Sequence, residues 1–125
     1  MAKRILIVDD DEALLKTFSF IISHEGYECI ISHSGQEAIE KVKSEDIDFI
    51  FLDFLLPGTD GVEVYKEIKT IKPDMPVVIM TGYVEKEVTQ NIKDSGSYGV
   101  LYKPFDVEKI SNILEEYFKG QEAKA

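Results

Sequence analysis

The sequence predicts an α/β fold of the doubly wound type: one five-stranded parallel sheet with helices on both faces. Five short apolar runs alternate with segments of helical period along the 125-residue chain. Runs this short and rich in β-branched residues are typical of strands buried in a parallel sheet. Polar residues also follow four of the runs, where each strand ends. For five alternating units the common strand order is 2-1-3-4-5, the flavodoxin-like order.

The first half of the chain supplies two strand-helix units. The first strand covers residues 5–8, and a helix with apolar residues at three- and four-residue spacing follows Asp10 and ends at Gly26. The second strand covers 27–32. Ser34 and Glu37 then have the spacing of a capping box, so the second helix is expected to begin there.

The third strand, 49–52, is followed by a helix that opens at Asp60 and stops before Pro73, because the residue before a proline disfavours helical geometry. The fourth strand, 77–80, leads into a weaker helix over 84–95, with Gly96 as its C-terminal stop. The fifth strand covers 100–102, and Asp106 is expected to cap the last helix.

One domain is expected over residues 1–120, with 121–125 as a frayed tail. The net charge of -10 argues against direct contact with nucleic acid, because its phosphates need a basic surface. No apolar stretch approaches the roughly 20 residues that span a bilayer, and none has the form of a signal peptide. Cys29, the one cysteine, is interpreted as a strand residue and can form no internal disulfide. We therefore expect a cytoplasmic location without membrane contact.

The polar residues at the strand ends predict the site. Asp9 and Asp10 follow the first strand, Asp53 the third, Thr81 the fourth and Lys103 the fifth. Ligands bind at the carboxyl edge of such sheets, and strands one and three are neighbours there, about 4.8 Å apart. Three carboxylates this close repel unless a cation lies among them, and Mg²⁺ is the natural choice. Lys103 lies about 10 Å across the sheet from Asp53, a gap that its long side chain can close.

This set of residues can transfer a phosphoryl group. Asp53, at the mouth of an apolar strand, can act as a nucleophile toward phosphorus. The metal and Lys103 would neutralise charge on the transferring oxygens, and Thr81 offers a hydroxyl donor. Taken singly, each residue also has an ordinary interpretation, as a helix cap, a turn residue or a solvated lysine. For Asp11 we keep that interpretation and expect an N-cap, not a ligand. For the others, their shared position at one sheet edge disfavours coincidence.

These residues lie in motifs that resemble the receiver domain of a two-component response regulator, over essentially the whole chain. The motifs are Val8-Asp9-Asp10, the run from Asp53 to Gly61, Thr81-Gly82 and Lys103-Pro104-Phe105. The resemblance implies that Asp53 is the phosphoacceptor, served by a sensor histidine kinase, a phosphotransfer protein or a small phosphodonor. It implies that Asp10 binds Mg²⁺ directly, Asp9 largely through water and Leu55 through its backbone carbonyl. Thr81 and Lys103 would contact the phosphoryl oxygens.

By the same resemblance, the chain catalyses only its own phosphorylation and slow dephosphorylation and is not otherwise an enzyme. The kinase would dock near the first helix and the loop after Lys103. The fourth helix, fifth strand and fifth helix would contact a downstream protein or effector domain, whether the chain is a stand-alone receiver or part of a longer regulator. Val100 occupies a position that is often aromatic in the family, so we expect switching through Thr81 and the segment after it. Leu55 and Tyr83 are bulky where water would approach, which predicts slow loss of phosphate.

Three other functions use similar residues or the same sheet order. An aspartate-nucleophile phosphatase of the haloacid dehalogenase type needs a second acid two residues after the nucleophile, and Leu55 stands there. A flavin- or nucleotide-binding module needs a glycine- or hydroxyl-rich loop after the first strand, where this chain has four acids at 9–12. A pseudo-receiver that only docks proteins is disfavoured by the complete residue set.

Overall fold

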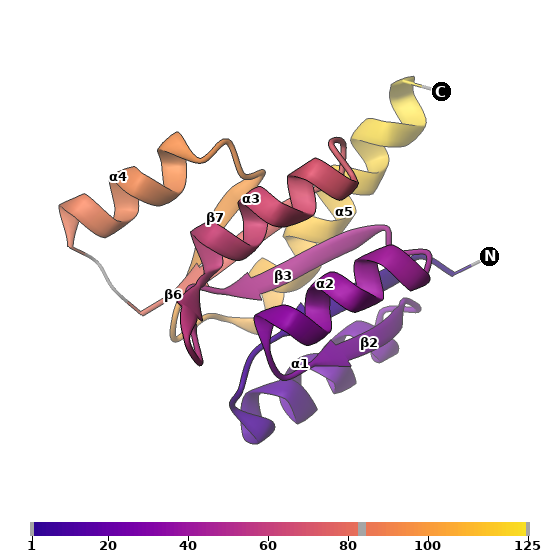
Figure 1. Ribbon diagram of the computed structural model, residues 1–125. Coiled ribbons are helices and arrows are strands. Elements are labelled where there is room, and N and C mark those ends of the chain that lie inside the picture. Colours follow the sequence, from indigo (N-terminus) through magenta and orange to yellow (C-terminus); the bar gives the residue numbers. More distant parts are fainter. Residues whose placement is uncertain (1, 83–84, 125) are drawn as a thin grey trace.

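The predicted sheet is present. The computed structural model describes residues 2–82 and 85–124, the last two as backbone only. Five parallel strands form one sheet in the order β2-β1-β3-β6-β7 (Figure 1). In chain order this is the predicted 2-1-3-4-5 arrangement, because β4 and β5 lie outside the main sheet. The strands are β1 (Arg4–Val8), β2 (Glu28–Ser32), β3 (Phe49–Asp53), β6 (Val77–Thr81) and β7 (Gly99–Tyr102).

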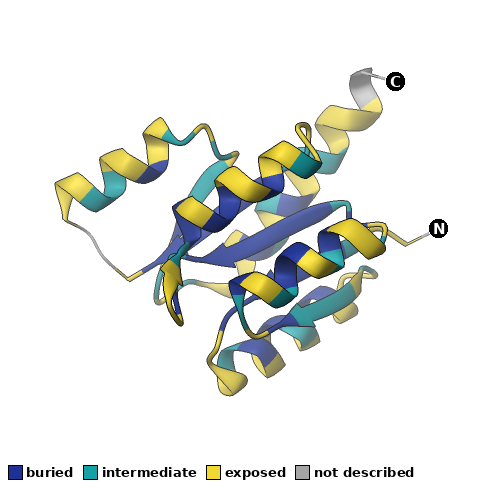
Figure 2. Ribbon diagram, in the orientation of Figure 1, coloured by how far each residue is buried: buried dark blue, intermediate teal, exposed yellow. Residues whose placement is uncertain are grey.

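The helices cover both faces of the sheet, as predicted. One apolar cluster joins a sheet face to three helices, α2 (Gly35–Ser44), α3 (Gly61–Ile71) and α4 (Lys86–Asp94). The opposite cluster joins the other face to α1 (Glu12–His24) and α5 (Val107–Lys124). The central strands are accordingly buried along their whole length, whereas the helices are exposed on their outer sides (Figure 2). None of the described helices is both long and apolar enough to cross a bilayer.

Polar caps begin three helices at the predicted residues. The Asp11 carboxylate accepts hydrogen bonds from the first backbone amides of α1, the Ser34 hydroxyl from the Glu37 amide, and the Asp60 carboxylate from the Glu63 amide. Each bond satisfies an amide that the helix itself leaves without a partner. The capping box is only half formed, since the Glu37 carboxylate accepts from the amide of His33 instead of that of Ser34.

Glycines end two helices where the sequence predicts a stop. Gly26 follows α1 with a φ of 90°, and Gly96 follows α4 with a φ of 86°. Both angles lie in the left-handed region, which glycine adopts without the steric cost of a Cβ atom. Helix α3 ends at Ile71, one residue before the Lys72–Pro73 pair.

The structure departs from or adds to the sequence prediction at three places. Helix α5 continues to Lys124, because the good helix formers after Gly120 can extend it, and fraying of 121–125 stays a prediction. Helix α4 begins at Lys86, and Val84 lies outside the described residues. A short antiparallel hairpin, β4 (Leu55–Leu56) and β5 (Thr59–Asp60), follows the main strand β3 and was not predicted.

Candidate functional site

The three predicted acids meet at the carboxyl edge of the sheet. Asp9 directly follows β1, and Asp53 is the last residue of β3, which pairs with β1. Carboxylate oxygens of Asp9, Asp10 and Asp53 all lie within 4.8 Å of one another. The buried apolar strands hold two of them in place, since Asp9 is 1 % and Asp53 6 % exposed, whereas Asp10 is exposed. Neighbouring strands therefore produce the cluster that the strand order predicts.

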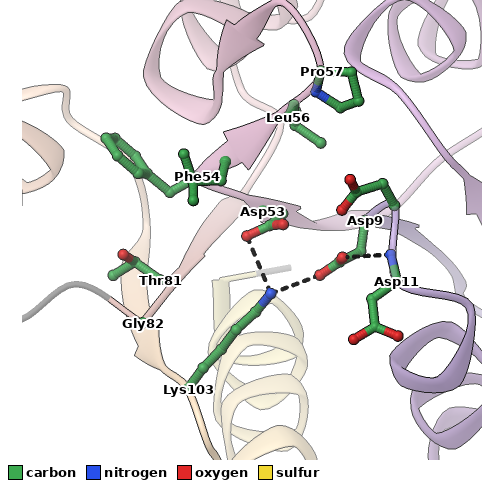
Figure 3. Close-up of a pocket in the computed structure, with 11 residues that line it drawn as sticks. Asp9, Asp11, Asp53, Phe54, Leu56, Pro57, Thr81, Gly82 and Lys103 are labelled. Atoms are coloured by element: carbon green, nitrogen blue, oxygen red, sulfur yellow. Dashed lines mark hydrogen bonds and ion pairs between the residues drawn. The ribbon is translucent and has the colours of Figure 1, made fainter.

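Lys103 reaches into this cluster from the end of β7. Its ammonium donates to Asp9 Oδ2 at 2.8 Å and to Asp53 Oδ1 at 3.2 Å, as Figure 3 shows. The backbone amide of Lys103 donates to the Thr81 carbonyl at 2.8 Å, which fixes the start of the lysine loop against β6. The Lys103–Pro104 peptide bond is cis. The lysine side chain thus crosses the strand between it and Asp53.

Asp9 is held from both sides. Its Oδ2 accepts from Lys103, and its Oδ1 accepts from the backbone amide of Asp11 at 3.0 Å. The Asp11 carboxylate in turn accepts from the amides of Ala13 and Leu14, at 3.0 and 3.3 Å. The prediction that Asp11 caps α1 is confirmed. Its backbone also positions Asp9, a contact that sequence reasoning did not find.

The surroundings shift the pKa of the two groups that would carry the chemistry. Burial raises the pKa of Asp53 first, and the charge of Asp9 raises it further; Lys103 and the backbone amide of Leu55 lower it, leaving a pKa of about 6 against 3.8 for a free side chain. Burial lowers the pKa of Lys103, but its hydrogen bond to Asp9 and the charge of Asp53 outweigh burial and raise it. The Lys103 ammonium therefore stays charged, but its single positive charge does not neutralise all three carboxylates.

An open hollow of about 660 Å³ gives access to these groups. Beside the acids and Lys103 it is lined by Thr81 and Gly82 after β6 and by the segment after Asp53, as Figure 3 shows. Thr81 is 1 % exposed at the end of β6, and Leu55 is 52 % exposed at the start of the short hairpin. The structure thus brings together all six predicted residues: Asp9, Asp10, Asp53, Leu55, Thr81 and Lys103.

The donor set fits a hard divalent cation. Three carboxylates within 4.8 Å of one another supply the oxygen ligands that Mg²⁺ prefers, and one side of the cluster faces the open hollow, where waters and phosphate oxygens can complete its coordination. A single ammonium cannot balance three carboxylates, so a cation among them would relieve their repulsion. Metal ligation by Asp9, Asp10, Asp53 and the Leu55 carbonyl stays a prediction. The predicted shielding by Tyr83 concerns a residue outside the described ones.

Comparisons with known proteins agree with this geometry. A family model described as the response regulator receiver domain matches residues 5–115. Sporulation initiation phosphotransferase F of Bacillus subtilis (strain 168) is 34 % identical over 117 residues, which cover 94 % of this chain and 94 % of that protein. The transcriptional regulatory protein ZraR of Klebsiella oxytoca is 35 % identical over 112 residues, 90 % of this chain but 25 % of that protein.

Solved structures show the same likeness over the whole chain. The receiver domain protein (CheY-like) from Methanospirillum hungatei JF-1 superposes with a TM-score of 0.93 at 30 % identity, covering 100 % of both chains. Chemotaxis protein CheY4 of Vibrio cholerae gives a TM-score of 0.86 at 27 % identity, covering 93 % of this chain and 98 % of that one. The chain therefore spans nearly all of some relatives and a quarter of others.

Proposed function

The chain belongs to the response regulator receiver domain family, and we propose that it accepts a phosphoryl group on Asp53 in a Mg²⁺-dependent reaction. The observation that carries the proposal is the Lys103 ammonium, which lies 2.8 Å from Asp9 and 3.2 Å from Asp53 at the mouth of an open hollow. A fixed cation beside a buried carboxylate is the arrangement that transfer of a charged phosphoryl group needs.

In the proposed step, an Asp53 carboxylate oxygen forms a bond to phosphorus as the phosphorus–nitrogen bond of a phosphohistidine donor breaks. The electron pair of that bond returns to the imidazole nitrogen. Bound Mg²⁺ supplies further charge neutralisation at the phosphoryl oxygens. Lys103 offers its ammonium to the same oxygens, and Thr81 its hydroxyl, because both line the hollow beside Asp53. The product is an acyl phosphate on this chain, so the reaction is a self-modification and not turnover of an external substrate.

The partners belong to the same proposal. A sensor histidine kinase or phosphotransfer protein would dock beside α1 and the loop after Lys103, where Leu14, Phe18 and Phe105 line an apolar hollow of about 490 Å³. A downstream protein or effector domain would read the surface of α4, β7 and α5. A cytoplasmic location is proposed with these partners. It is supported by the presence of one cysteine, which leaves no internal disulfide to form.

The test is incubation with acetyl phosphate or phosphoramidate and Mg²⁺, followed by intact mass. We expect one phosphate adduct, lost when Mg²⁺ is chelated and lost in Asp53→Asn. Asp11→Asn is the matched control: it lies beside the cluster but caps α1, and asparagine keeps that cap, so its adduct should persist. No adduct with any donor would support a protein-docking module instead.

A further inference from the structure

The amino edge of the sheet carries a second hollow, remote from the acid cluster. It measures about 780 Å³ and lies between the loop 73–76 after α3 and the last turns of α5. Figure 1 shows that loop beside α5, at the opposite end of the sheet from the C-terminal end of β6. Phe49 begins β3 and Asp53 ends it, so the two sites are separated by roughly 13 Å of strand.

Two tyrosine rings line this hollow opposite the apolar residues of the loop 73–76, and a buried phenylalanine contacts both rings. Tyr98 and Tyr117 meet edge to face with ring centroids 5.2 Å apart. Phe49, which is fully buried, contacts both rings edge-on at 5.8 and 5.3 Å. Such edge-to-face contacts favour one mutual orientation, so the rings are positioned before any ligand arrives. Tyr98 nonetheless remains 47 % exposed, so part of its ring is open to a ligand.

Carboxylates surround these rings. Asp74 and Glu116 line the hollow, and no lysine or arginine is among the described residues that line it. Burial raises the pKa of Tyr98, and Glu116 raises it further. Burial is also the main reason that the pKa of Tyr117 is raised, and Tyr98 and the charges of Asp48 and Asp74 raise it further. Carboxylates thus add negative charge near the two hydroxyls, and the Lys69 ammonium, which lies 3.7 Å from where a Cβ on Gly96 would stand, does not line the hollow itself.

We propose that this hollow binds the guanidinium group of an arginine side chain from a partner protein. A planar guanidinium can stack on the exposed Tyr98 ring while it donates to the carboxylates of Asp74 and Glu116. Arginine fits better than lysine, because its weakly hydrated planar group combines stacking with bidentate hydrogen bonding. The volume accommodates a whole arginine side chain with neighbouring backbone. The inference goes beyond the proposed phosphoryl transfer and does not depend on it.

The test is an NMR titration of the full unphosphorylated chain with N-acetyl-arginine amide, with N-acetyl-citrulline amide as the uncharged isostere. Both titrations use about 0.15 M salt, so that general attraction to the acidic chain is screened. We expect saturable shifts of the Gly96, Tyr98 and Gly120 amides, with a Kd in the millimolar range or below. Citrulline should bind at least 10-fold more weakly. Equal binding of the two ligands, or linear shifts without saturation, would overturn the proposal.

Conservative variants separate the hollow from general acidity. Glu116→Gln and Asp74→Asn should each weaken binding about 3-fold or more, and together about 10-fold. Glu87→Gln on the outside of α4 removes the same charge far from the hollow and should leave binding unchanged. Tyr98→Leu keeps apolar bulk without an aromatic face and should also weaken binding. If Glu87→Gln weakens binding as much as Glu116→Gln, the interaction is non-specific and the proposal fails.

Discussion

The segments that follow β3 and β6 are held very differently. After Asp53 the chain folds back into the β4–β5 hairpin and enters α3, which is capped by Asp60 and buries five residues. The next described helix after Thr81 is α4, whose N-cap residue Glu85 makes no side-chain capping bond and which buries only Ile92. In Figure 1, α4 projects from the body of the domain, whereas α3 lies along it.

A hydrogen bond joins α3 to the turn that follows α4. The Tyr65 hydroxyl of α3 donates to the Gly96 carbonyl just after α4, at 3.1 Å. With Ile92, this contact anchors the C-terminal end of α4, whereas the described residues at its start contribute only the partly buried Val88 and no side-chain cap. The difference suits the two roles proposed for these segments. A phosphoacceptor needs a fixed position, and an element that responds to it needs low local stability.

The largest expected effect comes from removing the buried anchor of each helix. Ile68→Ala in α3 and Ile92→Ala in α4 both truncate a fully buried isoleucine, a change that costs about 2–5 kcal/mol when the whole fold bears it. We expect Ile68→Ala to lower Tm by about 10 °C. Ile92→Ala should lower it less than half as much, because α4 can detach locally, while hydrogen exchange of the α4 amides rises on the order of 100-fold. Equal losses of Tm with uniform exchange would contradict the comparison.

A methyl group added to each segment probes how tightly it is packed. A Cβ at Gly61 would meet the Asp53 carbonyl oxygen at 2.6 Å and the Phe54 Cα at 3.0 Å, whereas a Cβ at Gly82 meets no atom within 4 Å. Gly61→Ala should therefore cost about 1–3 kcal/mol in urea unfolding, and Gly82→Ala less than about 0.5 kcal/mol. Gly61→Ala should also slow phosphorylation, because the added methyl group would force Asp53 to shift. A neutral Gly61→Ala would show that the first segment is not rigid.

The charged carboxylate of Asp53 should lower the folding stability of the protein at neutral pH when Mg²⁺ is absent. A carboxyl whose pKa is raised from 3.8 to about 6 binds its proton more tightly in the folded state, so folding stability falls as the pH rises through that interval. Asp53→Asn removes this loss and should stabilise the protein at pH 7.5 by about 1–2 kcal/mol, a value reduced by solvent screening at the open hollow.

Thermal unfolding from pH 4.5 to 7.5 checks this expectation, with Glu87→Gln as the exposed control. The advantage of Asp53→Asn should shrink toward pH 4.5 and should also shrink when Mg²⁺ is added to both proteins, because the ion stabilises the folded state of the wild type more. An advantage that is independent of pH would show that burial and the charge of Asp9 do not raise the pKa of Asp53 in the folded protein.

These two segments also show what the sequence could and could not predict. Local signals were sufficient for the caps at Asp11, Ser34 and Asp60, since an oxygen bonding an amide two or three residues ahead depends on neighbouring residues alone. The strand order then placed the acids together. The β4–β5 hairpin was missed, although Pro57-Gly58 carries a turn signal and Gly58 has a φ of 75°.

Contacts between distant residues were beyond local reasoning. Lys103 and Asp9 are 94 positions apart, and the sequence predicted only that the lysine could reach the cluster, not that it would bridge Asp9 and Asp53. The ring cluster of Phe49, Tyr98 and Tyr117 likewise depends on how α5 packs across the ends of two strands, which no spacing rule specifies.

The smallest effect should come from giving α4 the cap that it lacks. Glu85 has a φ of -59° and a ψ of 138°, an extended geometry that lets a serine hydroxyl accept from the amides of the first turn. Glu85→Ser should stabilise α4 by about 0.5–1 kcal/mol, seen as roughly 2- to 5-fold slower hydrogen exchange in its first turn, with Tm nearly unchanged. Glu85→Ala, which removes the same charge without adding an acceptor, is the matched control.

If phosphorylation acts by moving the start of α4, the difference in hydrogen exchange between the phosphorylated and free states should be smaller in Glu85→Ser than in Glu85→Ala. An identical difference in the two variants would mean that the response passes through another element, and the contrast between α3 and α4 would then concern stability alone.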